Sequence, residues 1–379
     1  MRSFTLGDIW GIPIRINTSL IVFLPVLAWL IGSGGQIEIY AGFIETLTGV
    51  GFDLARLRAG STPWVIGVAA AVGLFASVTV HELGHSWVAL RYGLTIESIT
   101  LWILGGMAAL SAIPREWNRE FWIAIAGPVT SVLLAAVCYV GLLVVPSSLV
   151  VPRFLFGWLA ITNVTLAVFN LLPAFPMDGG RILRALLARR RPYASATRIA
   201  GRIGVIFAFV FAIVGVFTFQ IILLLLAFFV YGAATTESRT VLLDELLTGI
   251  TVGEIATRDV TAVPAATTVE ELGERMLSDR RTVYMVLGEG GSIVGVVSLD
   301  DLKQARKRDR GQDTAGAVMR EVQRVTTDAD AFDTLALLNQ AGSTDALVEE
   351  DGAVVGVLSR SDYTRALTFQ REFRSGLGG

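Results

Sequence analysis

The chain has 379 residues, of which 53% are hydrophobic and 17% are charged, and its mean hydropathy is +0.62. These values exclude an average soluble domain, and the net charge of −2 argues against binding to nucleic acid. The single Cys138 lies in an apolar run, so an intrachain disulfide is excluded. The composition changes near residue 235, which predicts a membrane domain (1–235), a linker (236–250), a soluble domain (251–370) and a tail (371–379).

Six apolar segments are candidates for membrane-spanning helices, because about 20 apolar residues cross a bilayer. They are Thr18–Gly32 with Ile14–Ile16 in front of it, Pro63–Leu90, Phe121–Val145, Phe154–Phe175, Ile203–Phe217 and Phe219–Tyr231. The last two are separated only by a short polar interruption. One long helix with a re-entrant turn is therefore an alternative at that point.

The second of these segments ends in His81-Glu82-Leu83-Gly84-His85. Residues four apart share one face of a helix, so both imidazoles can bind the same zinc ion. The glutamate between them can act as general base on water bound to that zinc. These are the only two histidines in the chain, and ionisable groups at membrane depth are costly and usually functional. A metal site is therefore favoured over a chance match.

Residues 94–113 are apolar and rich in β-formers, and they contain Gly105-Gly106. Non-helical backbone at membrane depth must be covered by protein or must line a water-filled cavity. We therefore predict a β-hairpin or re-entrant loop beside the helix Pro63–Leu90. An interfacial loop is the alternative.

The arginines predict the orientation in the membrane, since cytoplasmic loops carry an excess of Lys and Arg. With six spans, the loops on one side contain three arginines: Arg56, Arg58 and Arg153. The other side contains Arg2, Arg15, Arg91, Arg115, Arg119, Arg181, Arg184, Arg189, Arg190, Arg191, Arg198 and Arg202. We therefore predict a multi-pass protein of the cell membrane with both termini in the cytoplasm.

Asp178 is the predicted third metal ligand. In this topology Pro63–Leu90 and Phe154–Phe175 both run toward the cytoplasm, so Asp178 falls at the depth of the two histidines. A catalytic zinc needs three protein ligands and one open position. Pro176 and two glycines flank the aspartate and can turn its carboxylate inward. The alternative is that Asp178 caps the following helix, Gly179–Leu187.

The two motifs together resemble the site-2 protease family of intramembrane metalloproteases. The second motif reads Phe169-Asn170-Leu171-Leu172-Pro173-Ala174-Phe175-Pro176-Met177-Asp178-Gly179-Gly180. The resemblance implies zinc bound by His81, His85 and Asp178, water activated by Glu82, and a substrate or oxyanion contact from Asn170. It also implies that the segment around Gly105-Gly106 binds substrate as an added strand.

The sequence departs from the family pattern at two positions. Ser131 stands where family members often have Asn, so no polar role is carried to the helix Phe121–Val145. Met177 stands where Leu is common, which is a volume-conserving change.

Residues 251–304 and 314–368 repeat each other, which indicates two packed copies of one unit. Each copy is predicted to contain a helix (Val269–Asp279; Ala331–Ala341) and two strands (Thr282–Leu287 and Ile293–Val297; Asp345–Glu349 and Val354–Leu358). The copies end in Gly295-Val-Val-Ser298-Leu-Asp-Asp301 and Gly356-Val-Leu-Ser359-Arg-Ser-Asp362.

This half resembles a tandem pair of CBS domains. The resemblance implies that Ser298, Asp301, Ser359 and Asp362 bind an adenine nucleotide such as ATP or AMP, and that CBS domains can form a homodimer. The alternative is structural, because Ser-x-x-Asp is also a capping box that starts a helix.

The predicted fold is an α-helical polytopic membrane domain of about six transmembrane helices, followed by an α/β tandem CBS (Bateman-type) domain. The predicted function is intramembrane zinc endopeptidase, acting on a single-span membrane protein in the lipid bilayer and regulated by nucleotide through the CBS pair. The alternative is a CBS-regulated cation transporter or channel in which His81, Glu82 and Asp178 line the pathway.

Overall fold

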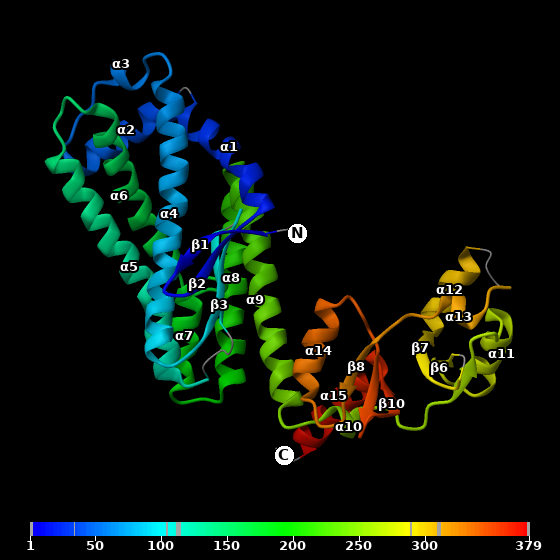
Figure 1. Cartoon of the computed structure of the whole chain (residues 1–379). Helices are drawn as coiled ribbons and strands as arrows, with labels where there is room; N and C mark the ends of the chain where they lie inside the picture. The colour runs from blue at the N-terminus through cyan, green and yellow to red at the C-terminus, as the bar shows by residue number, and fades with distance from the viewer. Residues whose placement is uncertain are drawn as a thin grey trace. The chain divides into compact units, whose positions relative to one another are not determined.

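The computed structural model describes residues 3–376 except 34, 104, 111–114, 289 and 309–311. The chain forms two compact units, Met1–Arg239 and Thr240–Gly379 (Figure 1). The boundary lies within helix α9 (Ile221–Leu247), so part of the predicted linker is the end of a long helix.

The first unit is helical, with one small sheet. Its helices are α1 (Thr18–Gly32), α2 (Gln36–Thr48), α3 (Leu54–Leu57), α4 (Thr62–Arg91), α5 (Trp117–Val144), α6 (Val150–Asn170), α7 (Asp178–Ala188), α8 (Tyr193–Phe217) and α9. Among the described residues, α4, α5, α6, α8 and α9 are long and apolar enough to cross a membrane. The pair α1 and α2, bent by 68°, gives a sixth candidate span. This confirms the prediction of about six transmembrane helices.

Several helix boundaries differ from the prediction. Ile14–Ile16 belongs to a strand and does not extend the first helix. The predicted helix Phe154–Phe175 ends at Asn170, because Pro173 and Pro176 cannot donate the backbone hydrogen bonds that would continue it. The last two spans are separate helices, as predicted, and the alternative of one long helix is wrong: Phe219 lies between them with a φ of 53°, which a right-handed helix does not accommodate. Both helices are longer than the predicted Ile203–Phe217 and Phe219–Tyr231.

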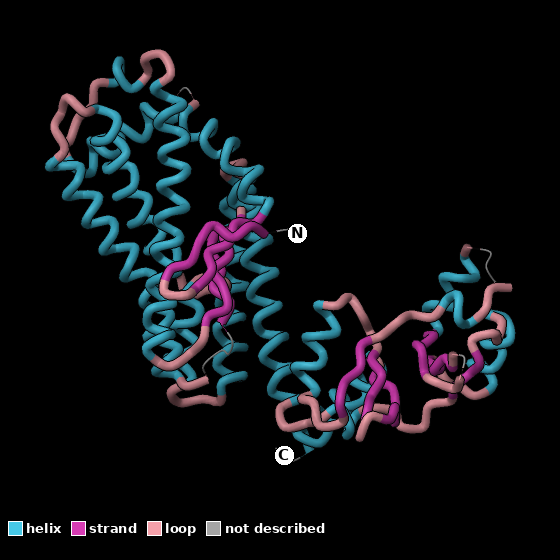
Figure 2. The backbone as a smooth tube through the Cα atoms, in the orientation of Figure 1, coloured by secondary structure: helices cyan, strands magenta, loops and turns pink. Residues whose placement is uncertain are grey.

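The sheet contains β1 (Ser3–Ile9), β2 (Ile12–Asn17), β3 (Ile96–Trp102) and β4 (Gly105–Leu110) in the order β1-β2-β3-β4. Strands β3 and β4 form the predicted antiparallel hairpin, so the interfacial-loop alternative is wrong for the described residues of 94–113. Strand β2 pairs in parallel with β3, which joins the start of the chain to this hairpin. Figure 2 shows the four strands gathered beside the helices.

One apolar cluster fixes the sheet against α4. Ile12 and Ile14 of β2 and Ile99 of β3 are buried with Phe75 and Val78 of α4. Val78 lies one turn before His81 on the same helix. Packing of the sheet therefore positions its free edge strand, β4, close to the His-Glu-x-x-His segment.

The second unit contains two copies of one α/β motif. The first copy is α10 (Val252–Ile255), β5 (Ala262–Pro264), α11 (Val269–Ser278), β6 (Val283–Leu287), β7 (Ile293–Ser298) and α12 (Leu299–Lys307). The second is α13 (Ala315–Val318), β8 (Gln323–Thr326), α14 (Ala331–Gln340), β9 (Ala346–Glu350), β10 (Ala353–Leu358) and α15 (Arg360–Gly376). Each forms a three-stranded sheet with the same order and directions, as the repeat predicts.

The two copies contact each other through equivalent bridges. Thr257 of the first copy pairs with Val357 of the second, and Arg320 of the second pairs with Val296 of the first. Met285 and Leu347 pack together between them.

Candidate functional site

Helix α4 presents His81 and His85 on its buried face. The two side chains are almost completely enclosed, with 4% and 6% of their surface exposed. Their Nε2 atoms lie 3.2 Å apart, as the spacing of four residues predicts.

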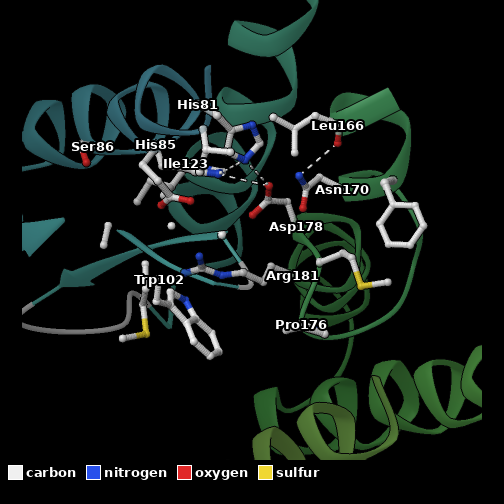
Figure 3. A pocket seen from close by; sticks show the side chains of 18 of the residues that line it. His81, His85, Ser86, Trp102, Ile123, Leu166, Asn170, Pro176, Asp178 and Arg181 are labelled. Carbon is white, nitrogen blue, oxygen red and sulfur yellow. Dashed lines mark hydrogen bonds and ion pairs between the residues drawn. The ribbon is translucent and has the colours of Figure 1, made fainter. Parts of the chain in front are cut away.

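Asp178 lies against both imidazoles (Figure 3). Its Oδ2 atom is 3.1 Å from Nε2 of His81 and 3.1 Å from Nε2 of His85. It is the first residue of α7, and its side chain makes no capping hydrogen bond to that helix, whose N-cap residue is Met177. The capping alternative is therefore wrong, and the carboxylate is directed at the histidines.

Two glycines allow α7 to begin at this point. A Cβ on Gly179 would lie 2.3 Å from the carbonyl oxygens of Leu171 and Leu172, and one on Gly180 would lie 2.7 Å from backbone atoms of the Ala174–Phe175 peptide. Larger residues would push the helix away from the turn that follows α6. The close approach places Asp178 at the depth of the histidines.

The Nδ1 atoms of both rings have polar partners. Nδ1 of His85 lies 2.7 Å from the carbonyl oxygen of Ile123 and can only donate to it, while Nδ1 of His81 lies 2.9 Å from Oγ of Ser131. Both partners belong to α5. Such contacts fix the ring orientation and leave the Nε2 lone pairs free to bind a metal. The expectation that this helix has no polar role is therefore wrong, because Ser131 contacts His81.

Gly127 of α5 leaves the space that the rings need. A Cβ at this position would lie 2.2 Å from Nε2 of His85 and 2.7 Å from Nε2 of His81. Any side chain here would fill the point on which the ligand atoms converge. No motif in the sequence predicts this role for Gly127.

The residues present fit a zinc ion. Two imidazole nitrogens and one carboxylate oxygen, all within 4.8 Å of one another and buried, form the donor set that catalytic zinc uses. Three acceptors brought together away from water would repel one another without a cation or protons between them.

A cavity of about 450 Å³ opens beside this cluster. Glu82 lines it and lies against β4, since a Cβ on Gly106 would be 2.6 Å from the Glu82 Cγ. Asn170 also lines it and donates a hydrogen bond of 3.0 Å to the carbonyl of Leu166 in its own helix. Figure 3 shows Asn170 beside Asp178. Every residue predicted for the catalytic site is thus brought to one cavity.

A buried ion cluster anchors α7. Nε of Arg184 donates to Glu120 of α5 over 2.7 Å, and Nη1 pairs with Glu237 of α9. Arg184 and Glu120 are each only 1% exposed. No sequence motif indicated this cluster, which fixes the helix that begins with Asp178.

The predicted nucleotide residues lie at the two interfaces between the CBS-like copies. Ser298 and Asp301 form a capping box at α12, and Asp301 also pairs with Arg320 over 2.8 Å. Burial lowers the pKa of Arg320, but Asp301 and Asp345 raise it to a net value above the usual one. At the other interface, Asp362 accepts hydrogen bonds from Ser359 and from Thr257. Asp362 also accepts the backbone N–H of Ser359 over 2.8 Å, as Asp301 accepts that of Ser298. The helix-starting role is therefore present at both sites, and it does not exclude a ligand at either.

Comparisons with known proteins agree with these two units. The profile of peptidase family M50 matches residues 69–151 and 147–211, and that of the CBS domain matches residues 252–308 and 315–368. A zinc metalloprotease of Methanocaldococcus jannaschii is 31% identical over 376 residues, which cover 97% of this chain and 96% of the relative. The protein Rip3 of Mycobacterium tuberculosis is 31% identical over 384 residues, which cover 97% and 93%.

Among solved structures, a site-2 protease from Methanocaldococcus jannaschii covers 63% of this chain and 96% of its own, with 34% identity and a TM-score of 0.42. The sequence relatives span nearly the whole length of both chains, so the match includes the membrane unit and the paired repeats together. The resemblance found in the two motifs is confirmed, and the chain belongs to peptidase family M50, the site-2 protease family, with a tandem pair of CBS domains after its membrane unit.

Proposed function

We propose that this multi-pass membrane protein is a zinc endopeptidase that hydrolyses peptide bonds in or near the transmembrane segment of a single-span membrane protein. His81, His85 and Asp178 are its zinc ligands. The observation that carries the proposal is the approach of one Asp178 oxygen to within 3.1 Å of both imidazole nitrogens in a buried cluster.

Glu82 is the proposed general base. Its side chain follows His81 directly and lies in the cavity against Gly106. When bound, zinc polarises the peptide carbonyl and lowers the pKa of water. Glu82 accepts the proton of the attacking water and returns it to the leaving amine. Asn170, in the same cavity, contacts the substrate peptide or the developing oxyanion.

Strand β4 is proposed to present the substrate. It is an edge strand of the four-stranded sheet, so its outer backbone groups can pair with an added extended chain. A helix hides its carbonyls in internal hydrogen bonds, and pairing as a strand exposes them. Because Gly106 contacts Glu82, a chain on this edge would pass beside the general base.

The CBS pair is proposed to bind an adenine nucleotide and to regulate the peptidase. Its support is the placement of Ser359 and Asp362 on a cavity of about 260 Å³ between the two copies. We further propose that the chain dimerises through its CBS domains. We also propose that both of its termini lie in the cytoplasm. The cation-transporter alternative is not favoured, because the relatives that span the chain include a named zinc metalloprotease.

Replacement of Glu82 by Gln tests the peptidase proposal. The amide is nearly isosteric but cannot accept the proton, so we expect hydrolysis of fluorescently labelled casein and of single-span test proteins to fall by about 10²–10⁴-fold. Zinc content, measured by mass spectrometry, should stay near one ion per chain.

His85→Ala is the matched control, because it should lose zinc and activity together. Unchanged hydrolysis by the Glu82→Gln variant would contradict the assigned base. Wild-type protein that binds no zinc, but carries cations across proteoliposomes, would restore the transporter alternative.

A further inference from the structure

The CBS pair contains two equivalent interfaces with different chemistry. Each combines a serine and an aspartate at the start of a helix with one bridging residue from the other copy. That residue is Arg320 beside Ser298 and Asp301, and Thr257 beside Ser359 and Asp362. The backbone bridges match closely, with N–O distances of 3.0–3.1 Å for Arg320 with Val296 and 3.0 Å for Thr257 with Val357.

At the first interface the side chain of Arg320 occupies the space beside the aspartate. Its Nε lies 2.8 Å from Asp301 Oδ1, and its Nη2 lies 2.7 Å from Asp345 Oδ2 and 3.2 Å from Ser298 Oγ. Asp301 and Asp345 are therefore neutralised by one guanidinium. A ligand could reach Asp301 only by displacing an arginine held by two carboxylates.

At the second interface the bridging residue is too short to do this. Thr257 Oγ1 donates to Asp362 Oδ1 over 2.7 Å, and a cavity of about 260 Å³ remains beside the pair. Val283 lines this cavity at the position that Asp345 holds in the first interface. The two positions are equivalent because Tyr284, the next residue after Val283, pairs with Val297, and Ala346, the next residue after Asp345, pairs with Leu358.

The lining of the second cavity contains three arginines and two aspartates, Asp259 and Asp362, so its net charge is positive. Arg280, Arg281 and Arg365 line it. Arg281 pairs with Asp259, and Arg365, which is 70% exposed, pairs with Asp362. None of the ion pairs between described residues involves Arg280, which is exposed and lines the cavity, so its charge is available to an anion. Gly342 stands at the equivalent place in the first interface, where it shares the positive φ of Arg280 and has no side chain.

We infer that the CBS pair binds one nucleoside phosphate per chain, at the Thr257–Asp362 interface, and that Arg320 closes the equivalent interface. This inference rests on the proposed nucleotide regulation and specifies its site and stoichiometry.

Three chemistries in the open cavity favour a nucleoside phosphate. Asp362 and Thr257 offer hydrogen-bond partners for sugar hydroxyls. Arg365, which pairs with Asp362, is 70% exposed and held by this one carboxylate, so a ligand can displace it more easily than Arg320, which is 34% exposed and held by two. Val260, Val283 and Val357 form apolar walls against which a flat base can pack. The arginines at the rim suit a phosphate, which guanidinium groups bind through paired, charge-assisted hydrogen bonds.

Nucleotide binding to the full-length protein in detergent tests the inference. Equilibrium dialysis with radiolabelled AMP and ATP should give about one nucleotide per chain. Thr257→Arg places at the second interface the side chain that closes the first, so binding should be lost. Thr257→Ser retains the hydroxyl that Asp362 accepts, and it should bind as the wild type does.

A second pair of variants does not depend on the fold of the Thr257→Arg protein. Arg280→Gln removes an exposed charge without breaking an ion pair, and it should weaken binding about tenfold. Arg275→Gln, an exposed arginine outside the cavity that pairs with Glu271, should leave binding unchanged.

The possible results separate the inference from the function on which it rests. Two nucleotides per chain, or normal binding by Thr257→Arg, would overturn the single site while nucleotide regulation stands. No nucleotide bound at millimolar concentration would overturn both, without affecting the zinc and peptidase assignments. Inorganic phosphate that competes as strongly as AMP would overturn the nucleoside class.

Discussion

The hydroxyl of Ser131 lies 2.9 Å from Nδ1 of His81, at a distance of 50 residues along the chain. A partner of this kind orients a metal-binding imidazole and selects the tautomer that leaves Nε2 free. His85 obtains the same support from a backbone carbonyl, which no side-chain substitution removes. At the residue scale, the proposed zinc site therefore depends on one replaceable hydroxyl.

Ser131→Ala should weaken zinc binding by about 10–100-fold, because it removes the partner of His81 Nδ1. Zinc competition with a chromogenic chelator measures this without any substrate. Thr165→Ala is the control, since the Thr165 hydroxyl donates to the Ile161 carbonyl of its own helix and, among the described residues, has no other hydrogen-bond partner. Equal zinc affinity for the two variants would show that Ser131 does not position the ligand.

At the element scale, the site is an assembly of helix ends and one strand edge. Helix α4 supplies the histidines and α5 their second partners, while α7 supplies Asp178. Strand β4 borders the cavity through Gly106. Each element is fixed by contacts outside the ligand cluster, so activity and stability can be changed separately.

Gly106→Ala should reduce hydrolysis and leave zinc binding intact. The added methyl group would lie 2.6 Å from Cγ and 3.1 Å from Oε1 of Glu82, and the flexible side chain must move. Peptidase assays beside zinc analysis check this. Gly7→Ala is the matched control in strand β1 of the same sheet: its added methyl group would meet nothing within 4 Å, so hydrolysis should stay as in the wild type. Loss of zinc from Gly106→Ala would instead indicate a general collapse of the site.

Arg184→Ala should destabilise the membrane unit strongly. It leaves the Glu120 carboxylate buried without its cation, and removal of one partner from a buried pair costs about 3–5 kcal/mol. Thermal unfolding in detergent measures the loss. Arg56→Ala breaks only the exposed pair with Asp53 and should have little effect. A double change, Arg184→Met with Glu120→Leu, should recover part of the stability. Equal unfolding temperatures for Arg184→Ala and Arg56→Ala would refute the anchor.

At the scale of the whole molecule, α5 is long enough for its two ends to lie on opposite sides of a membrane. It has 28 residues, which at about 1.5 Å per residue extend about 42 Å. Glu120, near its start, pairs with α7, and the arginine-rich segment follows α7. The turn that contains Ser147 lies beyond the other end of α5. The arginine bias thus predicts a cytoplasmic location for the end that holds the candidate site.

Cysteine labelling in intact cells tests this orientation. In a Cys138→Ala background, Ser147→Cys should react with a membrane-impermeant maleimide, and Arg190→Cys should react only after lysis. Both positions are exposed, so accessibility within the fold does not limit the reaction. Labelling of Arg190→Cys in intact cells would reverse the topology.

The sequence by itself determined the features that depend on local composition and spacing. Apolar length located the spans, a four-residue spacing placed His81 and His85 on one face, and the repeat located both CBS domains. Asp178 was predicted through the arginine bias, since orientation sets the depth of each helix end. These signals are readable because each lies within one segment.

Only the tertiary structure decided the features that depend on distant segments. The pairing of β2 with β3, the contact of Ser131 with His81, and the space beside Gly127 each join residues dozens of positions apart. The two Ser-x-x-Asp signatures look alike in sequence, yet Arg320 fills one interface and Thr257 leaves the other open. Such differences follow from which side chains meet across a packed interface, and spacing along the chain does not encode that.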